Sequence, residues 1–281
     1  MENTNTPAWF ITGAASGFGL AFAQYALSQG YNVVATGRSL EKLHAAFPDK
    51  LAGLHLVGLD VTKPAEAEAA IQAAIAAYGR IDVLINNAGY GIVGAFEETS
   101  DEELRAQIET NFFGAVNVTR AALPVLRQQK AAAIVNVSSL GGQLSFAGFS
   151  GYSSSKIAME GMSEALAQEV APFGIKVLIL EPGAFRTGFA SDALKHMPRM
   201  AEYDNIVGGT REFARGMDGT QEGDPARAAA ALDRALKDEH TPLRLALGAD
   251  AVAAVRSHSE ALLKDLTTWE RVALSTRFDD K

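Results

Sequence analysis

Short apolar segments alternate with longer segments of helical periodicity along most of the chain, and this alternation restricts the fold more than any other feature. We expect strands at residues 9–12, 32–36, 54–59, 83–86, 133–138, 176–181 and 243–247. Between them, helices are expected at residues 19–29, 65–78, 101–129, 155–171 and 225–238. Most of the strands are rich in Val, Ile and Leu without polar alternation, as parallel strands are when helices cover both faces of a sheet. The sequence therefore predicts an α/β fold, with a single doubly wound parallel sheet of about seven strands flanked by helices.

Two regions depart from this alternation. Residues 186–223 combine several glycines with bulky apolar side chains. We interpret this insertion as a mobile lid, with a packed pair of surface helices as the alternative. The C-terminal segment, residues 249–281, is expected to form an amphipathic helical extension that docks on the domain or on a sister subunit. Its apolar side chains recur at near-helical spacing, at Val252, Val255, Leu262, Leu266, Trp269 and Val272. With these two additions, residues 1–281 are predicted to form one domain.

Composition narrows the classes of function. The chain has 33 acidic and 25 basic residues and a formal net charge of −8, which disfavours a nucleic-acid partner. It has no cysteine, so disulfides, thiolate metal sites and a cysteine nucleophile are excluded. The histidines are isolated in the sequence, and we expect no metal site. No signal-peptide pattern and no membrane-spanning apolar stretch is visible, so a cytoplasmic protein without a membrane partner is expected.

A glycine-rich turn, residues 12–19 with the sequence TGAASGFG, follows the first expected strand and opens the first helix. Glycines permit a tight turn in which backbone N–H groups approach a pyrophosphate at the positive end of a helix. An ordinary strand-to-helix turn is the alternative, but the position within a βαβ unit favours a Rossmann-like dinucleotide site. The residues predicted to bind the dinucleotide in this turn are Gly13, Ser16, Gly17, Phe18 and Gly19.

The end of the second expected strand indicates which dinucleotide is bound. An acidic side chain there would accept the ribose hydroxyls of NAD, but Gly37 offers none. Arg38 presents a planar guanidinium suited to a phosphate, although it could also be a solvated charge near a helix start. We therefore expect NADP(H), with Ser39 as a second contact to the 2′-phosphate.

Two other strand ends would complete the cofactor site. Asp60, followed by Val61, could accept the adenine amino group, or Asp60 could cap the next helix. Asn87, Ala88 and Gly89 follow the fourth strand, at the sheet edge where open α/β sheets bind ligands. A plain Asn-Gly-type turn is the alternative for this second segment.

Tyr152 and Lys156 form a candidate catalytic pair. Residues four apart share a helix face, and a nearby ammonium favours the phenolate form of a tyrosine. Ser139 ends the preceding strand, thirteen residues before Tyr152. A hydroxyl there could hold a substrate oxygen, and Ser138 could do so instead.

Together these motifs resemble those of the compact branch of the short-chain dehydrogenase/reductase family, over about residues 8–190. The marks of that family are Thr-Gly-x-x-x-Gly-x-Gly, Asn-Asn-Ala-Gly, an Asn in the next helix, a Ser, Tyr-x-x-x-Lys and Pro-Gly-x-x-x-Thr. The chain has them in that order at residues 12–19 and 86–89, Asn111, Ser139, Tyr152 with Lys156, and residues 182–187. The resemblance implies an NAD(P)-dependent oxidoreductase acting on carbonyl and alcohol groups, and a homodimer or homotetramer.

The resemblance also implies a role for each motif residue. Tyr152 would be the general acid of reduction and the base of oxidation, and Lys156 would lower its pKa and bind the nicotinamide ribose. Ser139 would orient the substrate oxygen, and Asn111 would hold a water that joins Lys156 to solvent. Asn111 could otherwise mark a helix kink. The turn that follows the sixth strand would grip the nicotinamide carboxamide through Pro182, Gly183, Phe185 and Thr187, or be a simple loop.

The substrate pocket is expected to be mainly apolar, for a medium-sized hydrophobic ketone, aldehyde or secondary alcohol. Its predicted lining residues are Ser139, Leu140, Gln143, Phe149 and Phe189. One alternative function is a catalytically weak, NADP(H)-sensing binding protein, which would not need the Ser–Tyr pair. Another is an extended-type sugar-nucleotide epimerase or dehydratase, which the glycine spacing and the chain length disfavour.

Overall fold

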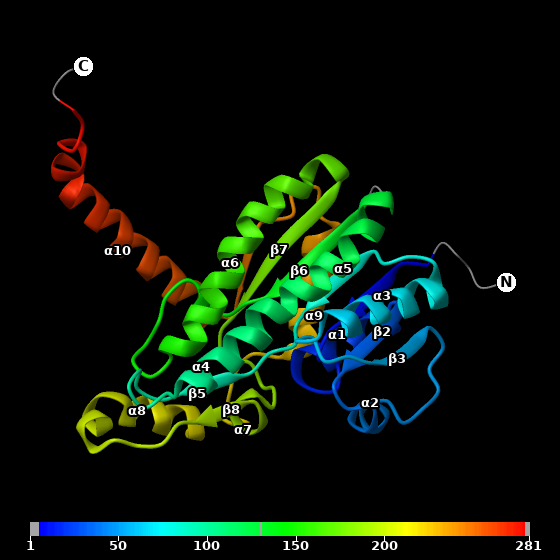
Figure 1. Cartoon of the computed structure of the whole chain (residues 1–281), viewed down its shortest axis with the longest axis horizontal. Helices are drawn as coiled ribbons and strands as arrows, with labels where there is room; N and C mark the ends of the chain where they lie inside the picture. Colours follow the sequence, from blue (N-terminus) through cyan, green and yellow to red (C-terminus); the bar gives the residue numbers. More distant parts are fainter. Residues whose placement is uncertain (1–5, 130, 279–281) are drawn as a thin grey trace.

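A seven-stranded parallel sheet lies at the centre of the computed structural model, which describes residues 6–129 and 131–278 (Figure 1). The strand order is β3-β2-β1-β4-β6-β7-β9. The bounds are β1 Ala8–Ile11, β2 Asn32–Gly37, β3 Leu54–Gly58, β4 Val83–Asn86, β6 Ala132–Val137, β7 Ile175–Pro182 and β9 Arg244–Leu247. All seven predicted strands are present, and their ends lie within one residue of the predicted ends. The predicted fold class is therefore confirmed.

Helices cover both faces of this sheet (Figure 1). The helices α1 (Gly17–Ser28), α2 (Leu40–Ala46) and α9 (Pro225–Lys237) pack on one face, and α3 (Pro64–Tyr78), α5 (Gly114–Gln129) and α6 (Ser150–Val170) pack on the other. Successive side chains of a strand point to opposite faces, so Phe10 and Ile11 enter different apolar clusters. This two-sided burial explains why the strands are apolar throughout.

Strand β1 marks the point at which the strand order reverses. It pairs with β2 on one side, where Ile11 lies beside Ala35, and with β4 on the other, where Ile11 lies beside Ile85. The chain winds outward from β1 to β3 and then returns to β4. The loops that follow β1 and β4 therefore diverge and leave a crevice at the carboxyl edge of the sheet, where doubly wound folds bind ligands.

The helix predicted at residues 101–129 is interrupted at its middle by a π-helical turn. Helix α4 (Asp101–Ile108) continues through Glu109–Phe113 in π geometry into α5. Asn111 lies at the centre of this turn. Single π turns inside α-helices frequently accompany functional sites because they redirect a side chain.

The insertion at residues 186–223 packs against the body of the domain. It contains α7 (Phe189–Asp192), strand β8 (Leu194–His196) and α8 (Asp204–Gly216), and β8 pairs with the short strand β5 (Gly91–Val93). A buried ion pair, 2.6 Å between Arg211 Nη2 and Glu98 Oε2, attaches α8 to the segment after β5. This packed arrangement is closer to the surface-helix alternative, although it contains one long helix rather than two.

The C-terminal helix α10 (Ala249–Leu274) leaves the body of the molecule and projects outward (Figure 1). Within this fully described helix, only Ala251 is buried. Of the two expected alternatives, the helix does not dock along its own domain, and docking on a sister subunit stays a prediction. Residues 279–281 of the predicted extension lie outside the described residues. Across the described ranges, neither α10 nor any other helix is both long and apolar enough to cross a membrane.

Candidate active site

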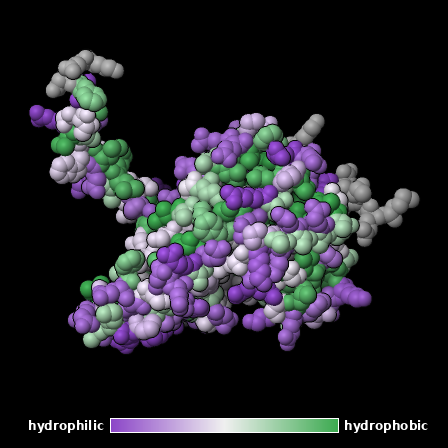
Figure 2. Space-filling model, in the orientation of Figure 1, coloured by the Kyte–Doolittle hydropathy of each residue, from purple (hydrophilic) through white to green (hydrophobic). Residues whose placement is uncertain are grey.

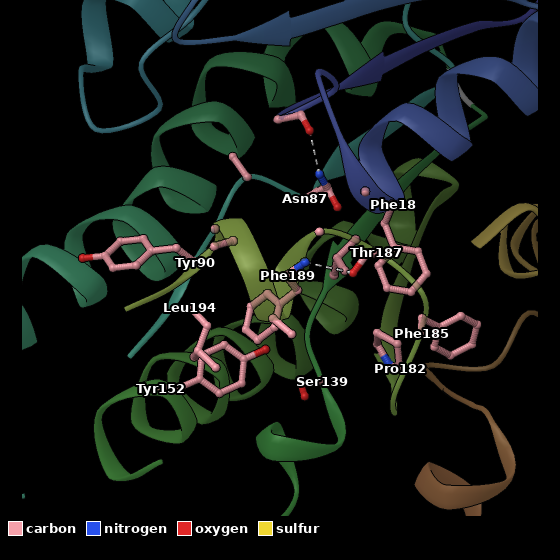
Figure 3. A pocket seen from close by; sticks show the side chains of 18 of the residues that line it. Phe18, Asn87, Tyr90, Ser139, Tyr152, Pro182, Phe185, Thr187, Phe189 and Leu194 are labelled. Carbon is pink, nitrogen blue, oxygen red and sulfur yellow. Dashed lines mark hydrogen bonds between the residues drawn. The ribbon is translucent and has the colours of Figure 1, made fainter. Parts of the chain in front are cut away.

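A pocket of about 980 Å³ opens at the carboxyl edge of the sheet and lies across the reversal point (Figure 3). This volume lies within the range of ligand-binding clefts. Its two ends differ in composition. Figure 3 shows Tyr152, Phe189 and Leu194 grouped at one end and Phe18, Phe185 and Thr187 at the other. The loops after β1, β2, β4, β6 and β7 all contribute to its walls.

The glycine-rich turn after β1 forms the wall at the start of α1. Gly13 has φ +66° and Gly17 has φ +55°, a left-handed conformation that favours glycine. A Cβ on Gly19 would lie 2.6 Å from Asn87 Nδ2, so a side chain there would displace the neighbouring loop. Within the described residues no side chain caps α1, and Ser16 makes no capping hydrogen bond. The first N–H groups of α1 are therefore available to a bound anion, and the turn fits a dinucleotide pyrophosphate.

Asn87 and Ala88 hold this turn in place. The Asn87 Nδ2 group donates to the carbonyl oxygens of Thr12, at 2.9 Å, and Gly13, at 3.1 Å. In return, Thr12 Oγ1 accepts hydrogen bonds from the backbone N–H groups of Asn87 and Ala88. The side-chain amide of Asn87 is thus used to shape the pocket. Together with Gly89, the two residues also line it.

The loop after β2 brings two cations to the pocket. Arg38 is exposed and lines the pocket, as predicted. The Ser39 Oγ atom accepts from the Lys42 backbone N–H at 3.2 Å and so caps α2, which the sequence analysis missed. Lys42 also lines the pocket and was not predicted. If Ser39 had been recognised as the N-cap of a short helix, Lys42 would have been expected in the first turn of that helix, beside Arg38.

Asp60 also lines the pocket, beside Val61. Its Oδ1 atom accepts from the backbone N–H of Thr62, at 3.1 Å, and from the Thr62 hydroxyl, at 2.8 Å. Lys63, not Asp60, is the N-cap residue of α3, so the capping alternative is wrong. Burial would raise the pKa of Asp60, but the Thr62 hydrogen bonds and the charges of Lys63 and Arg38 lower it overall. A carboxylate therefore persists at the adenine end of the predicted site.

Tyr152, Lys156 and Ser139 come together at the other end of the pocket. Tyr152 and Lys156 lie one turn apart on α6, and Lys156 Nζ is 5.8 Å from the Tyr152 ring centroid. Lys156 Nζ donates to the Val137 carbonyl oxygen at 2.8 Å, which fixes the ammonium at the end of β6. The Ser139 hydroxyl lies near the Tyr152 ring and lowers the pKa of its phenol. Its oxygen also accepts from the Gly141 N–H at 3.1 Å, so it is held in one orientation.

Burial decides the protonation of Tyr152 and Lys156. It raises the pKa of Tyr152 to about 12, against a smaller lowering by Ser139. It lowers the pKa of Lys156 to about 8, and the charge of Glu160 opposes this shift. In the protein alone, desolvation of the phenolate thus dominates the pKa of Tyr152, and its lowering by Lys156 together with a bound cofactor stays a prediction. The phenol is protonated at neutral pH, as a proton donor must be.

The structure separates the two adjacent serines. Ser138 Oγ donates to the buried carboxylate of Glu160 at 2.6 Å. Ser139 instead reaches Tyr152. Of the two alternatives that the sequence leaves open, Ser139 is thus the hydroxyl beside the phenol.

Asn111 lies behind the pocket wall and is buried. Its Nδ2 group donates to the Tyr90 carbonyl oxygen and to Ser155 Oγ, both at 2.9 Å. Its Oδ1 atom accepts from the Tyr90 backbone N–H at 3.1 Å. The π-helical turn directs the Asn111 side chain toward the loop after β4. Asn111 therefore both marks a helix kink and lies near Lys156, as the two alternatives predicted. A Cβ on Gly89 would lie 3.0 Å from Asn111 Oδ1 and 3.8 Å from Lys156 Nζ.

Gln143 does not line the pocket, contrary to the prediction. Its Nε2 group donates to Glu160 Oε2 at 2.9 Å and to Glu181 Oε1 at 2.8 Å. Arg244 completes this buried polar cluster, with Nε 3.2 Å from Glu160 and 3.4 Å from Glu181. Two buried carboxylates need this amide and this guanidinium to offset their desolvation, and that requirement keeps Gln143 away from the substrate side. Burial and, to a smaller extent, the neighbouring Glu160 raise the pKa of Glu181 to about 7, against the lowering by Gln143 and Arg244.

Apolar side chains surround the Tyr152 hydroxyl. The Phe189 ring centroid lies 5.6 Å and the Phe149 centroid 6.2 Å from that of Tyr152. Leu140 lines the same end, as predicted. The pocket also includes residues that were not predicted to line it, contributed by the insertion and by the start of α10: Leu194, Met217 and Ala254.

The turn after β7 forms the wall opposite α1. Pro182, Gly183, Phe185 and Thr187 all line the pocket, as predicted. The Phe185 ring centroid lies 5.1 Å from that of Phe18, so a bulky residue is accommodated here by an aromatic partner. Asp250, in the first turn of α10, accepts from the Ala184 N–H at 2.7 Å. The base of α10 therefore braces this turn.

Comparison with known proteins yields consistent matches. The sequence model of the short chain dehydrogenase family matches residues 8–198. An oxidoreductase of Botryotinia fuckeliana is 40% identical over 96% of this chain and 99% of its own. A 3-ketodihydrosphingosine reductase of Bacteroides thetaiotaomicron is 45% identical over 65% of each chain.

Solved structures agree with these sequence matches. The crystal structure of a short-chain dehydrogenase from Streptomyces avermitilis superposes with a TM-score of 0.90 at 48% identity, over 98% of this chain and 99% of that one. A short chain dehydrogenase/reductase from Burkholderia phymatum, in complex with NAD, superposes with a TM-score of 0.80 at 25% identity, over 94% and 97% of the two chains.

Proposed function

The chain belongs to the short chain dehydrogenase family, whose model covers residues 8–198, and we propose that it is an NADP(H)-dependent oxidoreductase acting on a hydrophobic ketone, aldehyde or secondary alcohol. One observation carries the proposal. The Tyr152 phenol and the Ser139 hydroxyl lie in an apolar end of the same pocket that the glycine-rich turn closes at its other end. A proton donor and a dinucleotide cradle thus share one cleft.

The bound nicotinamide would supply or accept the hydride, and the residues of this chain manage the proton. In reduction, Ser139 holds the carbonyl oxygen of the substrate while the Tyr152 hydroxyl donates its proton to that oxygen. The Lys156 ammonium, anchored on the Val137 carbonyl, then stabilises the phenolate that remains. Phe149 and Phe189 exclude water around the reacting groups. Oxidation uses the same groups in reverse, with Tyr152 as the base.

The choice of NADP(H) rests on charge at the end of β2. Arg38 and Lys42 line the pocket, and Gly37 offers no carboxylate to the ribose hydroxyls. A 2′-phosphate between these two cations would gain charge-assisted hydrogen bonds. The neighbour from Burkholderia phymatum was solved in complex with NAD at 25% identity, so the shared fold alone does not select NADP(H). The choice of NADP(H) here rests on the local charges.

The substrate side favours a carbonyl compound with a large apolar part. Most side chains near Tyr152 are apolar. The pocket of about 980 Å³ extends beyond the predicted dinucleotide site to this apolar end, where a substrate would bind. The relative from Bacteroides thetaiotaomicron is named for the reduction of a ketone, which supports the same direction for this chain. We also propose a cytoplasmic homo-oligomer without a nucleic-acid partner, in keeping with the net charge of −8.

A panel of ketones and aldehydes of increasing apolar size tests this function. NADPH oxidation is followed with each compound, and NADPH binding is titrated in parallel by fluorescence. We expect turnover that improves with apolar size and is poor for highly charged carbonyls. NADPH binding without turnover across the panel would contradict the proposal and favour the NADP(H)-sensing alternative.

A further inference from the structure

Helix α10 exposes far more apolar surface than an isolated helix tolerates. Every residue from Ser259 to Phe278 is exposed. Figure 2 shows hydrophobic atoms along the projecting helix. The large apolar side chains that are more than half exposed on it are Leu262, Leu263, Leu266, Trp269, Val272 and Leu274. A helix whose own domain leaves such a surface open needs a partner.

The extension is also present in a related crystal structure. The short-chain dehydrogenase from Streptomyces avermitilis superposes over 98% of this chain, which leaves far fewer residues unmatched than the 26 of α10. The segment that forms α10 is therefore matched in that chain.

The apolar residues of α10 follow the spacing of a coiled-coil seam. Steps of three and four residues alternate along one stripe for about three heptads, the pattern of helices that pair along their length. The stripe consists of Val252, Val255, Ser259, Leu262, Leu266, Trp269 and Ala273. Ser259 is compatible with an apolar seam because its hydroxyl donates to the Val255 carbonyl oxygen at 2.8 Å. A second copy of α10 is the partner that this stripe fits.

Side-chain size selects an antiparallel pair. In an antiparallel pair centred near Leu263, Trp269 lies against the partner's Ser259, and Leu266 lies against the partner's Leu262. Large and small side chains then interlock, which packs a helix interface well. In a parallel pair, Trp269 would meet its own copy.

Charge selects the same orientation. Beside the antiparallel seam, Arg256 comes level with the partner's Glu270, and the two-fold axis repeats this contact. The only like-charged contact beside the seam is Asp265 with its own copy, at the solvent-exposed edge. A parallel pair would instead place Asp265 beside the partner's Glu270 twice, without a cation to offset them.

We propose that α10 forms an antiparallel, two-fold helix pair with α10 of a second copy of this chain. The proposal concerns assembly and does not depend on the reaction or on the choice of cofactor. In this pair the partner's Leu274 comes level with Ala254, which lines the catalytic pocket. The end of each helix therefore approaches the pocket of the other subunit.

Cross-linking tests the orientation. Because the chain has no cysteine, Leu263→Cys carries a single thiol, which lies beside its own copy in the proposed pair. Lys264→Cys places the thiol on the outer side of the helix and is the matched control. A short bis-maleimide should join Leu263→Cys into a covalent dimer and leave Lys264→Cys monomeric on a denaturing gel. Equal cross-linking of the two variants, or none with Leu263→Cys, would overturn the proposal.

Charge reversal tests the register by sedimentation velocity at low salt. Arg256→Glu and Glu270→Arg should each weaken association by roughly tenfold, and the double variant should restore it. A parallel pair predicts instead that Glu270→Arg alone tightens association, which would refute the proposed orientation. Leu266→Glu should lower the oligomeric state by one step while NADPH binding and circular dichroism stay unchanged. An unchanged oligomeric state would exclude α10 as the interface.

Discussion

Ser138 and Ser139 are adjacent in sequence, yet their hydroxyls serve different neighbours. Ser138 donates to the buried Glu160, whereas Ser139 lies beside Tyr152 in the pocket. Strand β6 ends at Val137, and the backbone at Ser139 is extended before a short 3₁₀ turn. This change of direction points one hydroxyl into the core and the next into the pocket. Ser138 therefore stabilises the fold, and Ser139 is placed to act on the substrate.

The two serines provide a matched pair of variants. Ser139→Ala should lower kcat by about 10²–10³ because the substrate oxygen loses a fixed donor, with little change in thermal stability. Ser138→Ala should instead lower the free energy of unfolding by about 1–3 kcal/mol, because Glu160 loses a buried partner. Steady-state kinetics and thermal melts of both variants measure this. A larger kinetic loss in Ser138→Ala than in Ser139→Ala would reverse the assignment.

The depressed pKa of Lys156 predicts a pH dependence of reduction. Lys156 is charged below pH about 8 and neutral above it, since burial lowers its pKa. We expect kcat/KM for carbonyl reduction to be constant below that pH. It should fall above it, because a neutral Lys156 no longer stabilises the Tyr152 phenolate that forms. The remaining activity of Lys156→Arg should lack this fall, because arginine stays charged. A flat profile in the wild-type chain through this range would contradict the role of Lys156.

Arg38 decides the cofactor in this account. Arg38→Leu should raise the KM for NADPH by roughly 10- to 100-fold, the value of one charge-assisted hydrogen bond to a phosphate. The KM for NADH, which lacks the 2′-phosphate, is the internal control and should change little. An equal effect on both dinucleotides would show that Arg38 does not contact the distinguishing group.

At the scale of the element, the long strands and helices could be predicted because burial on both faces leaves a clear apolar pattern. Strands β5 and β8 have three residues each, too few to show a period. Helix α2 has seven residues and was missed for the same reason. The sequence offered a kink at Asn111 as an alternative, but not its π-helical geometry, which goes with contacts that Asn111 makes to segments distant in sequence.

The candidate site shows the same division. Motif residues on the loops that follow strands reach the pocket because those loops share one edge of the sheet. Gln143 was misplaced because two carboxylates, Glu160 on α6 and Glu181 on β7, hold it from elements distant in sequence. Met217 and Ala254 were missed because their approach to the pocket depends on how the insertion and α10 pack. Sequence spacing cannot show such long-range contacts.

The polar cluster that joins α6, β7 and β9 predicts a pH-dependent stability. Burial and the nearby Glu160 raise the pKa of Glu181 from 4.5 to about 7, so folding favours its protonated form. The stabilisation is complete below pH 4.5 and is lost as the pH rises through about 7.

Thermal melts of Glu181→Gln and the wild type at pH 5 and pH 8 test this cluster. The Tm of the variant relative to the wild type should rise between the two pH values, by about 2–4 °C for each kcal/mol involved. Glu164→Gln, a more exposed partner of Arg244, is the control and should show no such trend. A constant difference between Glu181→Gln and wild type would contradict the raised pKa.

Across the molecule, the reversal of strand order at β1 brings the predicted dinucleotide site and the proton donor Tyr152 into one cleft. The glycine-rich turn reaches the cleft from one half of the sheet, and Ser139 and Tyr152 reach it from the other. Asp250 at the base of α10 braces the turn after β7, so the projecting helix is joined to the wall of the same pocket. Assembly through α10 and the shape of the active site are therefore connected.

If the Tyr152 hydroxyl supplies the proton in carbonyl reduction, the Tyr152→Phe substitution must slow the chemical step. This variant removes one oxygen and keeps the ring that packs against Phe149 and Phe189. With the best carbonyl substrate from the panel, single-turnover oxidation of bound NADPH should slow by about 10²–10⁴, while the Kd for NADPH stays within error of the wild type. Single-turnover oxidation at the wild-type rate in Tyr152→Phe would contradict the account.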